Sequence, residues 1–255
     1  MTTKNIIKDF PRVSKEIIAK ASLFQPAILA DVADRRGALH GRIAALRPHM
    51  KVAGPAFTVE VRAGDNLMIH AAMSLAKPGD VLVIDGKGDL TAALMGAIMI
   101  NACKKLGIAG VVIDGAIRDT LELEALDFPV FSVGSNPNGP TKQVSGRIGH
   151  PIQCGGVTVK AGDFVLADAD GVVVVEREIH AGGLAQGQED QRARADRPAQ
   201  GAGRPTPRHH GAVPHRGGAA DHRGRADRHS PRCLGLAVDR GGVATARGDR
   251  VVVAG

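Results

Sequence analysis

Three short apolar runs alternate with helix-like segments in the middle of this 255-residue chain. They occupy residues 81–84, 110–113 and 129–133 and are rich in β-branched and aromatic residues, which favour strands. Continuous apolar strands that alternate with helices are typical of β-α-β units, in which helices cover the faces of a largely parallel sheet. The sequence therefore predicts an α/β fold.

The segments before and after these runs extend the α/β body. Apolar residues recur at helical spacing over residues 12–22, 26–36 and 66–77, whereas residues 52–61 alternate like a strand. Between residues 151 and 176 short β-branched runs are separated by turns, which predicts a β-rich cap on the α/β body.

The formal charge of +7 is unevenly distributed along the chain. Residues 1–184 carry 20 Lys and Arg against 19 Asp and Glu, whereas residues 185–255 carry 13 Arg, no Lys and 7 acidic residues. We expect residues 1–184 to form one domain and residues 185–255 to be a disordered or non-native tail, because the tail lacks apolar periodicity. Three interpretations of the tail stay open: a disordered basic segment, a nucleic-acid-binding arm, or a GC-rich gene read out of frame. Because the charge belongs to the tail, nucleic acid is not an expected partner of the folded domain.

Nothing in the sequence directs the chain to a membrane or to export. The N-terminus lacks the apolar run of a secretory signal, and the apolar run at residues 92–102 is about half of the ~20 residues that a membrane span needs. The three cysteines form no CxxC motif and are odd in number, which favours buried free thiols in a reducing compartment. We therefore expect a cytoplasmic protein.

The strongest candidate for a functional site is the segment Arg118-Asp119-Thr120-Leu121-Glu122, which follows an expected strand at residues 110–114 and an expected turn at residues 115–117. Ligands of open α/β sheets collect beyond the carboxyl ends of the strands. An arginine beside a carboxylate has the chemistry to bind an anion together with a divalent metal ion. Asp119 and Glu122 also match a capping box, which needs no ligand, and both interpretations stay open.

Gly96 interrupts an apolar segment that is expected to be helical up to Leu106, after a glycine-rich turn at residues 85–89. A glycine inside a helix costs about 1 kcal/mol relative to alanine. Gly96 therefore either permits close packing, which is the favoured interpretation, or marks the start of a new helix whose free amides can bind a carboxylate.

Two other kinds of site find less support. Lys87 lies in the glycine-rich turn and could form a Schiff base with an oxo acid, although a lysine in such a loop is usually solvated. Zinc is not expected, because four histidines lack the mutual spacing of zinc ligands: His40, His49, His70 and His150.

Between residues 20 and 180, several of these motifs occur in an order that resembles the RraA-like family. The family includes the class II 4-hydroxy-4-methyl-2-oxoglutarate / 4-carboxy-4-hydroxy-2-oxoadipate aldolases. The resemblance rests on residues 79–86, Gly96 placed 22 positions before Arg118, the Arg118-Asp119-x-x-Glu122 motif, Gly134-Ser135-Asn136-Pro137, Pro151-Ile152, Gly162-Asp163 and residues 168–174.

The resemblance implies a fold, an assembly and an activity. The fold is an αββα sandwich of the swivelling-domain kind, assembled as trimers or hexamers with active sites at subunit interfaces. The activity is retro-aldol cleavage of a 4-hydroxy-2-oxo acid to release pyruvate, with oxaloacetate decarboxylation through the same enolate. By position, Arg118 binds the oxo-acid end of the substrate, Asp119 holds Mg²⁺ or Mn²⁺, and backbone amides contact the same end at Gly96, Ala97, Ile98 and Met99.

The chain departs from the family pattern in two places. The residue after Gly96 is often acidic in the aldolases, whereas here it is Ala97, and the family's C-terminal helix is not recognisable after about Gly187. The base is not identified by the resemblance, and Asp89 and Glu122 are candidates. The alternative function is that of RraA itself, a protein inhibitor of ribonuclease E that does not keep the metal-binding aspartate; the intact Arg118-Asp119 pair favours the enzyme.

Overall fold

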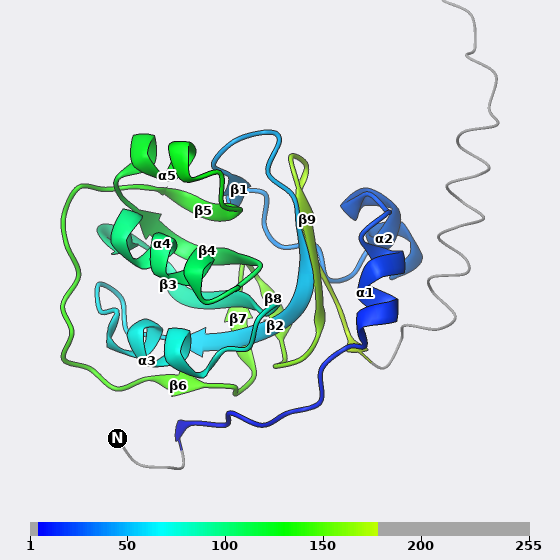
Figure 1. The fold of residues 1–255 in the computed structure, drawn as a ribbon, viewed down its shortest axis with the longest axis horizontal. Coiled ribbons are helices and arrows are strands. Elements are labelled where there is room, and N and C mark those ends of the chain that lie inside the picture. The colour runs from blue at the N-terminus through cyan, green and yellow to red at the C-terminus, as the bar shows by residue number, and fades with distance from the viewer. Residues whose placement is uncertain (1–4, 178–255) are drawn as a thin grey trace, which may run out of the picture. The chain divides into compact units, whose positions relative to one another are not determined.

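Residues 5–177 are described by a computed structural model, and they form an eight-stranded mixed sheet, a separate two-stranded sheet and two groups of helices (Figure 1). The helices are α1 (Lys15–Ala21), α2 (Pro26–Val32), α3 (Leu67–Leu75), α4 (Ala97–Lys105) and α5 (Thr120–Leu126). The strands are β1 (Ala44–Ala45), β2 (Val52–Glu60), β3 (Val81–Met95), β4 (Gly110–Ile117), β5 (Val130–Ser135), β6 (Arg147–Ile148), β7 (Ile152–Cys154), β8 (Val157–Val159), β9 (Phe164–Asp168) and β10 (Gly171–Val175).

The strand order of the main sheet is β1-β5-β4-β3-β2-β9-β10, with β6 paired to β2. Strands β2, β3, β4 and β5 are parallel neighbours, whereas β9 pairs antiparallel with the first half of β2 and β10 pairs antiparallel with β9. The carboxyl ends of the four parallel strands therefore meet along one edge of the sheet.

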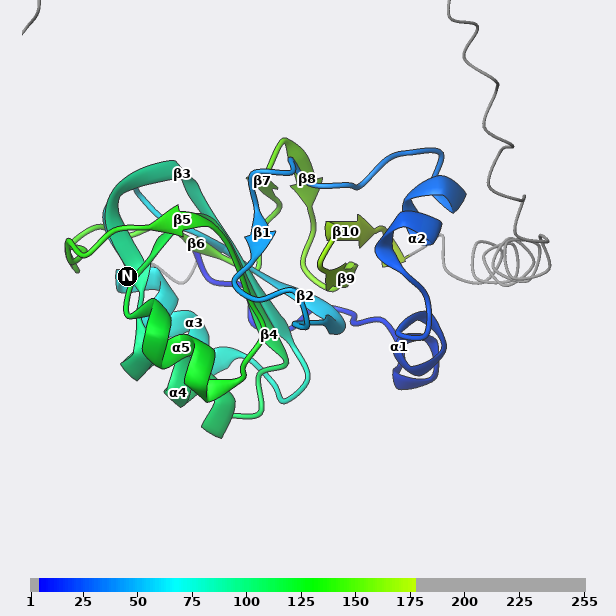
Figure 2. The ribbon, with the colours of Figure 1, turned by 90° about the horizontal axis from the view of Figure 1, so that it is seen from above.

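The layers follow from the faces on which apolar side chains are buried. Helices α3, α4 and α5 lie together on one face of the parallel strands (Figure 2), over a core that includes Phe57, Ile84 and Ile113. A second core lies between the other face and the β7–β10 layer, and a third joins β9 and β10 to α1 and α2. This succession of helices, sheet, strands and helices is the expected αββα arrangement.

Two sequence-based boundaries are wrong. The stretch 85–89 is not a turn before a helix: it belongs to β3, which runs on to Met95 beside β4 through several register shifts. Strand β4 likewise continues through Gly115 to Ile117. The pairing between these two strands overrides the local preference of glycine for turns. As a result Gly96 precedes α4 instead of lying inside a helix.

The two cysteines among the described residues are buried free thiols. Burial raises the pKa of Cys103 to about 12, so this thiol is inert at neutral pH. Within residues 5–177 no helix is long and apolar enough to cross a membrane. Cys233, the boundary near residue 184 and every interpretation of the tail lie outside the described residues.

An ion pair between the buried carboxylate of Asp114 and the exposed side chain of Arg42 joins β4 to the loops around it. Asp114 is 4% exposed and accepts hydrogen bonds from Arg42 Nη2 at 2.8 Å and from the Gly155 amide at 2.9 Å. Removing one partner of such a pair leaves a buried charge without compensation, which costs more than the pair contributes.

We predict that Arg42→Met lowers the free energy of unfolding by about 2 kcal/mol, because Asp114 keeps its burial and loses its cation. Urea unfolding followed by circular dichroism measures the change. Arg47→Met is the matched control: Arg47 pairs with Glu124 at the surface, and the loss there should stay below about 1 kcal/mol. Equal losses in the two variants would contradict the prediction.

Candidate active site

A cavity of about 140 Å³ opens at the carboxyl edge of the parallel strands. It lies where β3 ends before α4 and where β4 ends before α5, which is the place at which α/β sheets bind ligands. Its lining comes from the end of β3, the two strand–helix junctions, the start of α3 and the loop after β5: Asn66, His70, Ala93, Leu94, Met95, Gly96, Ile98, Met99, Arg118, Asp119, Pro140 and Lys142.

Gly96 lets the two strand–helix junctions approach each other. Its backbone is extended, with φ −144°, so the glycine is not required by a left-handed conformation. A Cβ atom at this position would collide with Asp119 Oδ2 and lie 3.0 Å from Arg118 Cγ. Both sequence-based interpretations of Gly96 therefore describe part of the structure, since it permits a close approach and also begins a new helix.

Asp119 turns its side chain away from its own helix. The residue precedes α5 in the left-handed conformation, with φ 60° and ψ 39°, and makes no side-chain cap to that helix. Its Oδ2 instead accepts a hydrogen bond of 3.0 Å from the amide of Ala97, in the first turn of α4. The capping-box interpretation is therefore wrong, and the strained backbone serves to carry a carboxylate to the N-terminus of a neighbouring helix.

Arg118 completes this junction. Its amide donates to the carbonyl of Met95 at 3.0 Å, and its Nε lies 3.7 Å from Asp119 Oδ2. The Arg118 side chain is 42% exposed and lies against Gly139, where a Cβ would be 3.2 Å from Nη1. A guanidinium held in this way keeps donors available for an anion in the cavity.

The first turn of α4 adds backbone donors to the same place. Ala97, Ile98 and Met99 are its first three residues, and the N–H groups of a helix's first turn have no acceptor within the helix. These amides and the helix dipole favour a negative group. The Ala97 amide already donates to Asp119 Oδ2, so the amides of Ile98 and Met99, two residues that line the cavity, are the ones left for a ligand.

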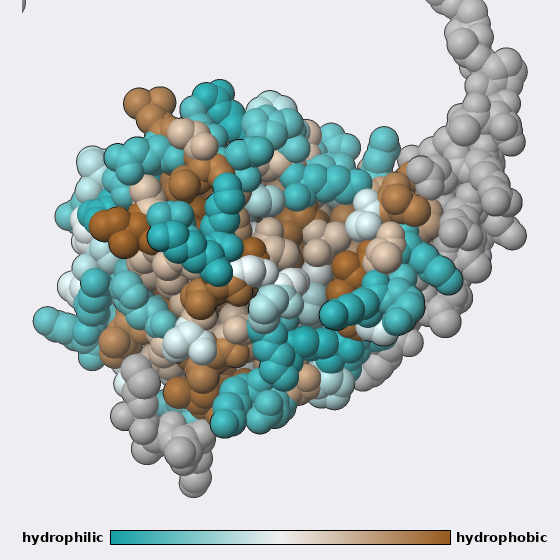
Figure 3. All heavy atoms as spheres, viewed as in Figure 1, coloured by the Kyte–Doolittle hydropathy of each residue, from teal (hydrophilic) through white to brown (hydrophobic). Residues whose placement is uncertain are grey.

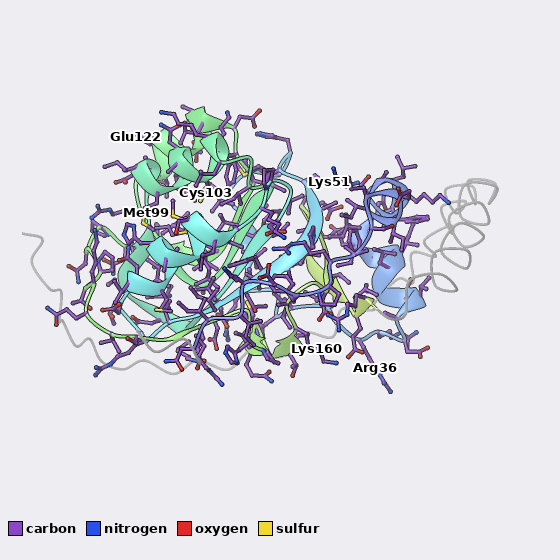
Figure 4. The ribbon with its side chains drawn as sticks, turned by 60° about the horizontal axis from the view of Figure 1, so that its bottom comes forward. Arg36, Lys51, Met99, Cys103, Glu122 and Lys160 are labelled. Carbon is purple, nitrogen blue, oxygen red and sulfur yellow. The ribbon has the colours of Figure 1, made fainter. Side chains whose placement is uncertain are left out.

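Two carboxylates named from the sequence do not line the cavity. Glu122 is exposed on α5, and Figure 4 shows it on a different helix from Met99 and Cys103 of α4. Asp89 accepts hydrogen bonds from the amide and hydroxyl of Thr91, at 3.0 and 2.8 Å from Oδ1. Their proposed role as acid or base stays a prediction.

Three cavity residues with polar side chains were missed from the sequence: Asn66, His70 and Lys142. Asn66 follows β2 just as Gly96 and Arg118 follow their strands, and this shared position was an available signal. His70 was set aside for lack of metal spacing, and Lys142 lies in a loop without a recognisable motif. Only the three-dimensional fold brings these residues to the same cavity.

Asn66 carries a polar atom that calls for a ligand or water. The residue is 2% exposed, and its Nδ2 donates to the carbonyl of Leu94 at 2.9 Å. Among the described residues, its Oδ1 is a buried oxygen with no hydrogen-bond partner. A buried unsatisfied group costs about 1–3 kcal/mol, and in a cavity wall it marks a place where a donor binds.

The cavity carries more positive than negative charge. Arg118 and Lys142 are its cations, and Asp119 is its carboxylate. Partial burial and, secondarily, the positive charge of Lys142 lower the pKa of His70, so its imidazole is neutral at neutral pH. The arrangement suits an anionic ligand.

Lys87 lies outside this cavity and is unsuited to Schiff-base chemistry. Its Nζ donates to Asp85 Oδ2 at 2.6 Å and to Glu60 Oε1 at 3.1 Å. Burial by itself would lower the pKa of Lys87, but the hydrogen bonds to these two carboxylates outweigh it and raise the pKa. A lysine that stays protonated is a poor nucleophile.

The donor set fits a hard divalent cation that keeps open positions. Asp119 offers a carboxylate that is 37% exposed, and Mg²⁺ commonly takes one or two carboxylates together with water and substrate oxygens. No three His, Cys, Asp or Glu side chains gather into a closed metal site within residues 5–177. Any cation bound at Asp119 therefore needs ligands from elsewhere, such as an oxo acid.

Known proteins resemble this chain in sequence and in fold. A curated protein of Halalkalibacterium halodurans, provisionally named a 4-hydroxy-4-methyl-2-oxoglutarate aldolase, is 46% identical over 149 residues, which are 58% of this chain and 71% of that protein. The crystal structure of Streptomyces coelicolor RraAS2, of the RNase ES inhibitor RraA family, is 28% identical with a TM-score of 0.66, covering 72% of this chain and 97% of that one.

A Thermus protein described as the RNA-processing inhibitor RraA is 30% identical with a TM-score of 0.56, over 60% of this chain and 92% of its own. The family model described as RraA-like, Aldolase/RraA, matches residues 21–174, a range that contains every residue of the cavity. The chain therefore belongs to the RraA-like family.

Proposed function

We propose that the protein cleaves a 4-hydroxy-2-oxo acid of the 4-hydroxy-4-methyl-2-oxoglutarate type in a divalent-metal-dependent retro-aldol reaction that releases pyruvate. The observation that carries the proposal is the Asp119 carboxylate, which is turned into a cationic cavity instead of capping its own helix. The 46% identity to the Halalkalibacterium protein supports the same substrate class.

The chain's own residues can hold the substrate at both ends. In this proposal the first-turn amides of Ile98 and Met99 and the guanidinium of Arg118 bind the C1 carboxylate and the 2-oxo oxygen. Lys142 lies on another wall of the same cavity and supplies the cation that a second carboxylate requires. Asn66 Oδ1 can accept a hydrogen bond from a substrate hydroxyl.

The reaction needs a proton acceptor and a stabilised enolate. A base takes the proton of the C4 hydroxyl, the C3–C4 bond breaks with its electrons going to C3, and the resulting pyruvate enolate takes a proton at C3. Asp119 would hold Mg²⁺ or Mn²⁺, which supplies a Lewis acid for the 2-oxo oxygen. Arg118 adds a fixed positive charge next to the developing enolate, and the neutral imidazole of His70 is a cavity-lining group able to accept a proton.

The same site would decarboxylate oxaloacetate, because loss of CO₂ from that acid leaves the same enolate. We propose in addition that the protein works as a homo-oligomer, a trimer or a hexamer. Apolar residues are exposed on the face over α4 and α5 (Figure 3): Ile98 is 85% exposed and lines the cavity, and Leu121 is 79% exposed. A partner subunit on this face would also exclude water from the cavity.

Removal of the metal or of its carboxylate should abolish the reaction. With Mg²⁺ or Mn²⁺, the purified protein should release pyruvate from 4-hydroxy-4-methyl-2-oxoglutarate and from oxaloacetate, measured with a lactate dehydrogenase assay. EDTA or Asp119→Asn should lower kcat/KM by about 10³-fold, because the enolate loses its Lewis acid.

Asp127→Asn is the matched control for Asp119→Asn. Asp127 also has a left-handed backbone conformation, with φ 48°, and lies at the other end of α5, but it does not line the cavity. Its variant should keep wild-type activity. Pyruvate release that survives both EDTA and Asp119→Asn would refute the metal mechanism, and inhibition of ribonuclease E without any pyruvate release would favour the alternative function.

Gly96→Ala tests the close approach of the two junctions. The added methyl group would displace the Asp119 carboxylate and the Arg118 side chain, so kcat/KM should fall by about 100-fold. Gly134→Ala is the control, since its Cβ would meet only Leu90 Cδ2 at 3.7 Å. Similar activities of the two variants would show that the junction geometry is not needed.

Lys87→Met separates the metal mechanism from Schiff-base chemistry. The variant should retain pyruvate release within a few-fold of wild type, and borohydride added with pyruvate should leave the mass of the wild-type protein unchanged. A mass increase that disappears in Lys87→Met would assign the reaction to the lysine instead.

A further inference from the structure

Asp65 is a buried carboxylate that no step of the proposed reaction uses. It lies between β2 and α3, is 1% exposed, and precedes the cavity residue Asn66. Its Oδ1 accepts a hydrogen bond of 3.0 Å from the amide of Leu67, the first residue of α3. This contact uses only one of its two oxygens.

The other oxygen of Asp65 binds the loop between β5 and β6. Oδ2 accepts from the hydroxyl of Thr141 at 2.7 Å, from the amide of Gln143 at 2.7 Å and from the amide of Val144 at 3.2 Å. Burial by itself would raise the pKa of Asp65, but these hydrogen bonds and the one from Leu67 lower it. The carboxylate therefore stays ionised and binds all four donors at neutral pH.

Lys142 lies between two of these donors. Thr141 and Gln143 flank it in the sequence, and both bind the same oxygen of Asp65, so the backbone of Lys142 is fixed on each side. Earlier in the loop, Asn138 is joined to β3 by its Nδ2, which donates to the carbonyl of Thr91 at 3.1 Å, and by its carbonyl, which accepts from the amide of Ala93 at 2.9 Å.

The loop between β5 and β6 is thus attached to the rest of the protein both before and after Lys142, a residue that lines the cavity. Lys142 lines the cavity, and its charge acts on His70, whose pKa it helps to lower. Long connections without secondary structure commonly carry binding residues, and their precision depends on how they are attached.

We infer that Asp65 is a positioning residue that holds Lys142 at the distance required to bind the second carboxylate of a dicarboxylic oxo acid. The inference rests on the proposed function for the identity of the substrate. It assigns to Asp65 a role in selectivity between ligands with two carboxylates and ligands with one. A residue that only stabilised the fold would affect both kinds of ligand alike.

The test measures binding of two probe ligands by isothermal titration calorimetry, in the presence of Mg²⁺. 2-Oxoglutarate carries two carboxylates and pyruvate carries one. Asp65→Asn places an amide NH₂ among donors. The backbone hydrogen bonds of Thr141 to Gly64 and Asn66 remain, but the amides of Gln143 and Val144 lose their charged acceptor, so the segment after Thr141 is held less firmly. The Kd for 2-oxoglutarate should therefore rise about tenfold, equivalent to about 1.4 kcal/mol. The Kd for pyruvate should change less than about twofold.

A double-mutant cycle identifies the residue through which Asp65 acts. Lys142→Met should weaken 2-oxoglutarate binding by a similar factor, and adding Asp65→Asn to it should cause no further loss. Independent, multiplicative losses would overturn the inference, as would equal losses for both ligands or a wild-type protein that does not bind 2-oxoglutarate.

Two further variants control for folding. Asp80→Asn removes an equally buried carboxylate, which is 1% exposed. Asp80 lies just before β3, away from the cavity, and accepts hydrogen bonds from Arg12 and from the Lys77 amide. This variant should lower the Tm without changing the ratio of the two Kd values. Thr141→Val removes one donor to Asp65 Oδ2 and should raise the Kd for 2-oxoglutarate in the same direction as Asp65→Asn, but less. If Asp65→Asn does not fold, Thr141→Val in the same cycle with Lys142→Met decides the question.

The double-mutant binding cycle tests the positioning role of Asp65, and the pyruvate-release assay tests the proposed aldolase activity, so each hypothesis can be refuted without the other. A protein that releases no pyruvate but shows coupling between Asp65 and Lys142 would refute the proposed aldolase activity and leave the positioning role intact. A protein that releases pyruvate without that coupling would refute the positioning role alone.

Discussion

The hydrogen bond from the Ala97 amide to the Asp119 carboxylate is the contact on which the cavity depends. It joins the start of α4 to the start of α5, and it can form only because Gly96 has no side chain. The long pairing of β3 with β4 sets the distance between these two junctions. The core beneath α3, α4 and α5 thereby supports a carboxylate, a guanidinium and a set of helix amides at one edge of the sheet.

The sequence predicts this architecture well and its boundaries less well. The α/β body with its β-rich cap and the cluster at Arg118 and Asp119 follow from apolar strands and from a charged segment after one of them, whereas the αββα arrangement follows from the resemblance to the family. The course of residues 85–96 could not be predicted, because β3 gains its stability there from pairing with β4, which local propensity does not report. Asn66 and Lys142 were missed because their contribution arises only when β2 and the loop after β5 meet α4.

Two left-handed residues show why backbone strain alone does not identify a site. Lys87 and Asp119 have almost the same φ, 64° and 60°, and both follow buried parts of neighbouring strands. Lys87 Nζ is bound by two carboxylates of the same sheet, so its charge is neutralised locally. Asp119 has Arg118 only at 3.7 Å and one amide donor, which leaves its carboxylate the capacity to bind a cation. The partners of the side chain, rather than the strain, distinguish the two.

The proposed function requires a nearly neutral domain to select a small dianion, and the placement of charge gives it a means to do so. Residues 1–184 carry 20 basic and 19 acidic side chains, so the domain as a whole exerts little long-range attraction. Physiological salt screens exposed charges beyond about 8 Å, whereas charges within a few ångströms of a bound ligand are screened much less. Selection therefore depends on where Arg118 and Lys142 are held. Arg118 is fixed by a strand end, but Lys142 is carried by a loop and needs the ionised, buried Asp65 to bring its charge to the cavity.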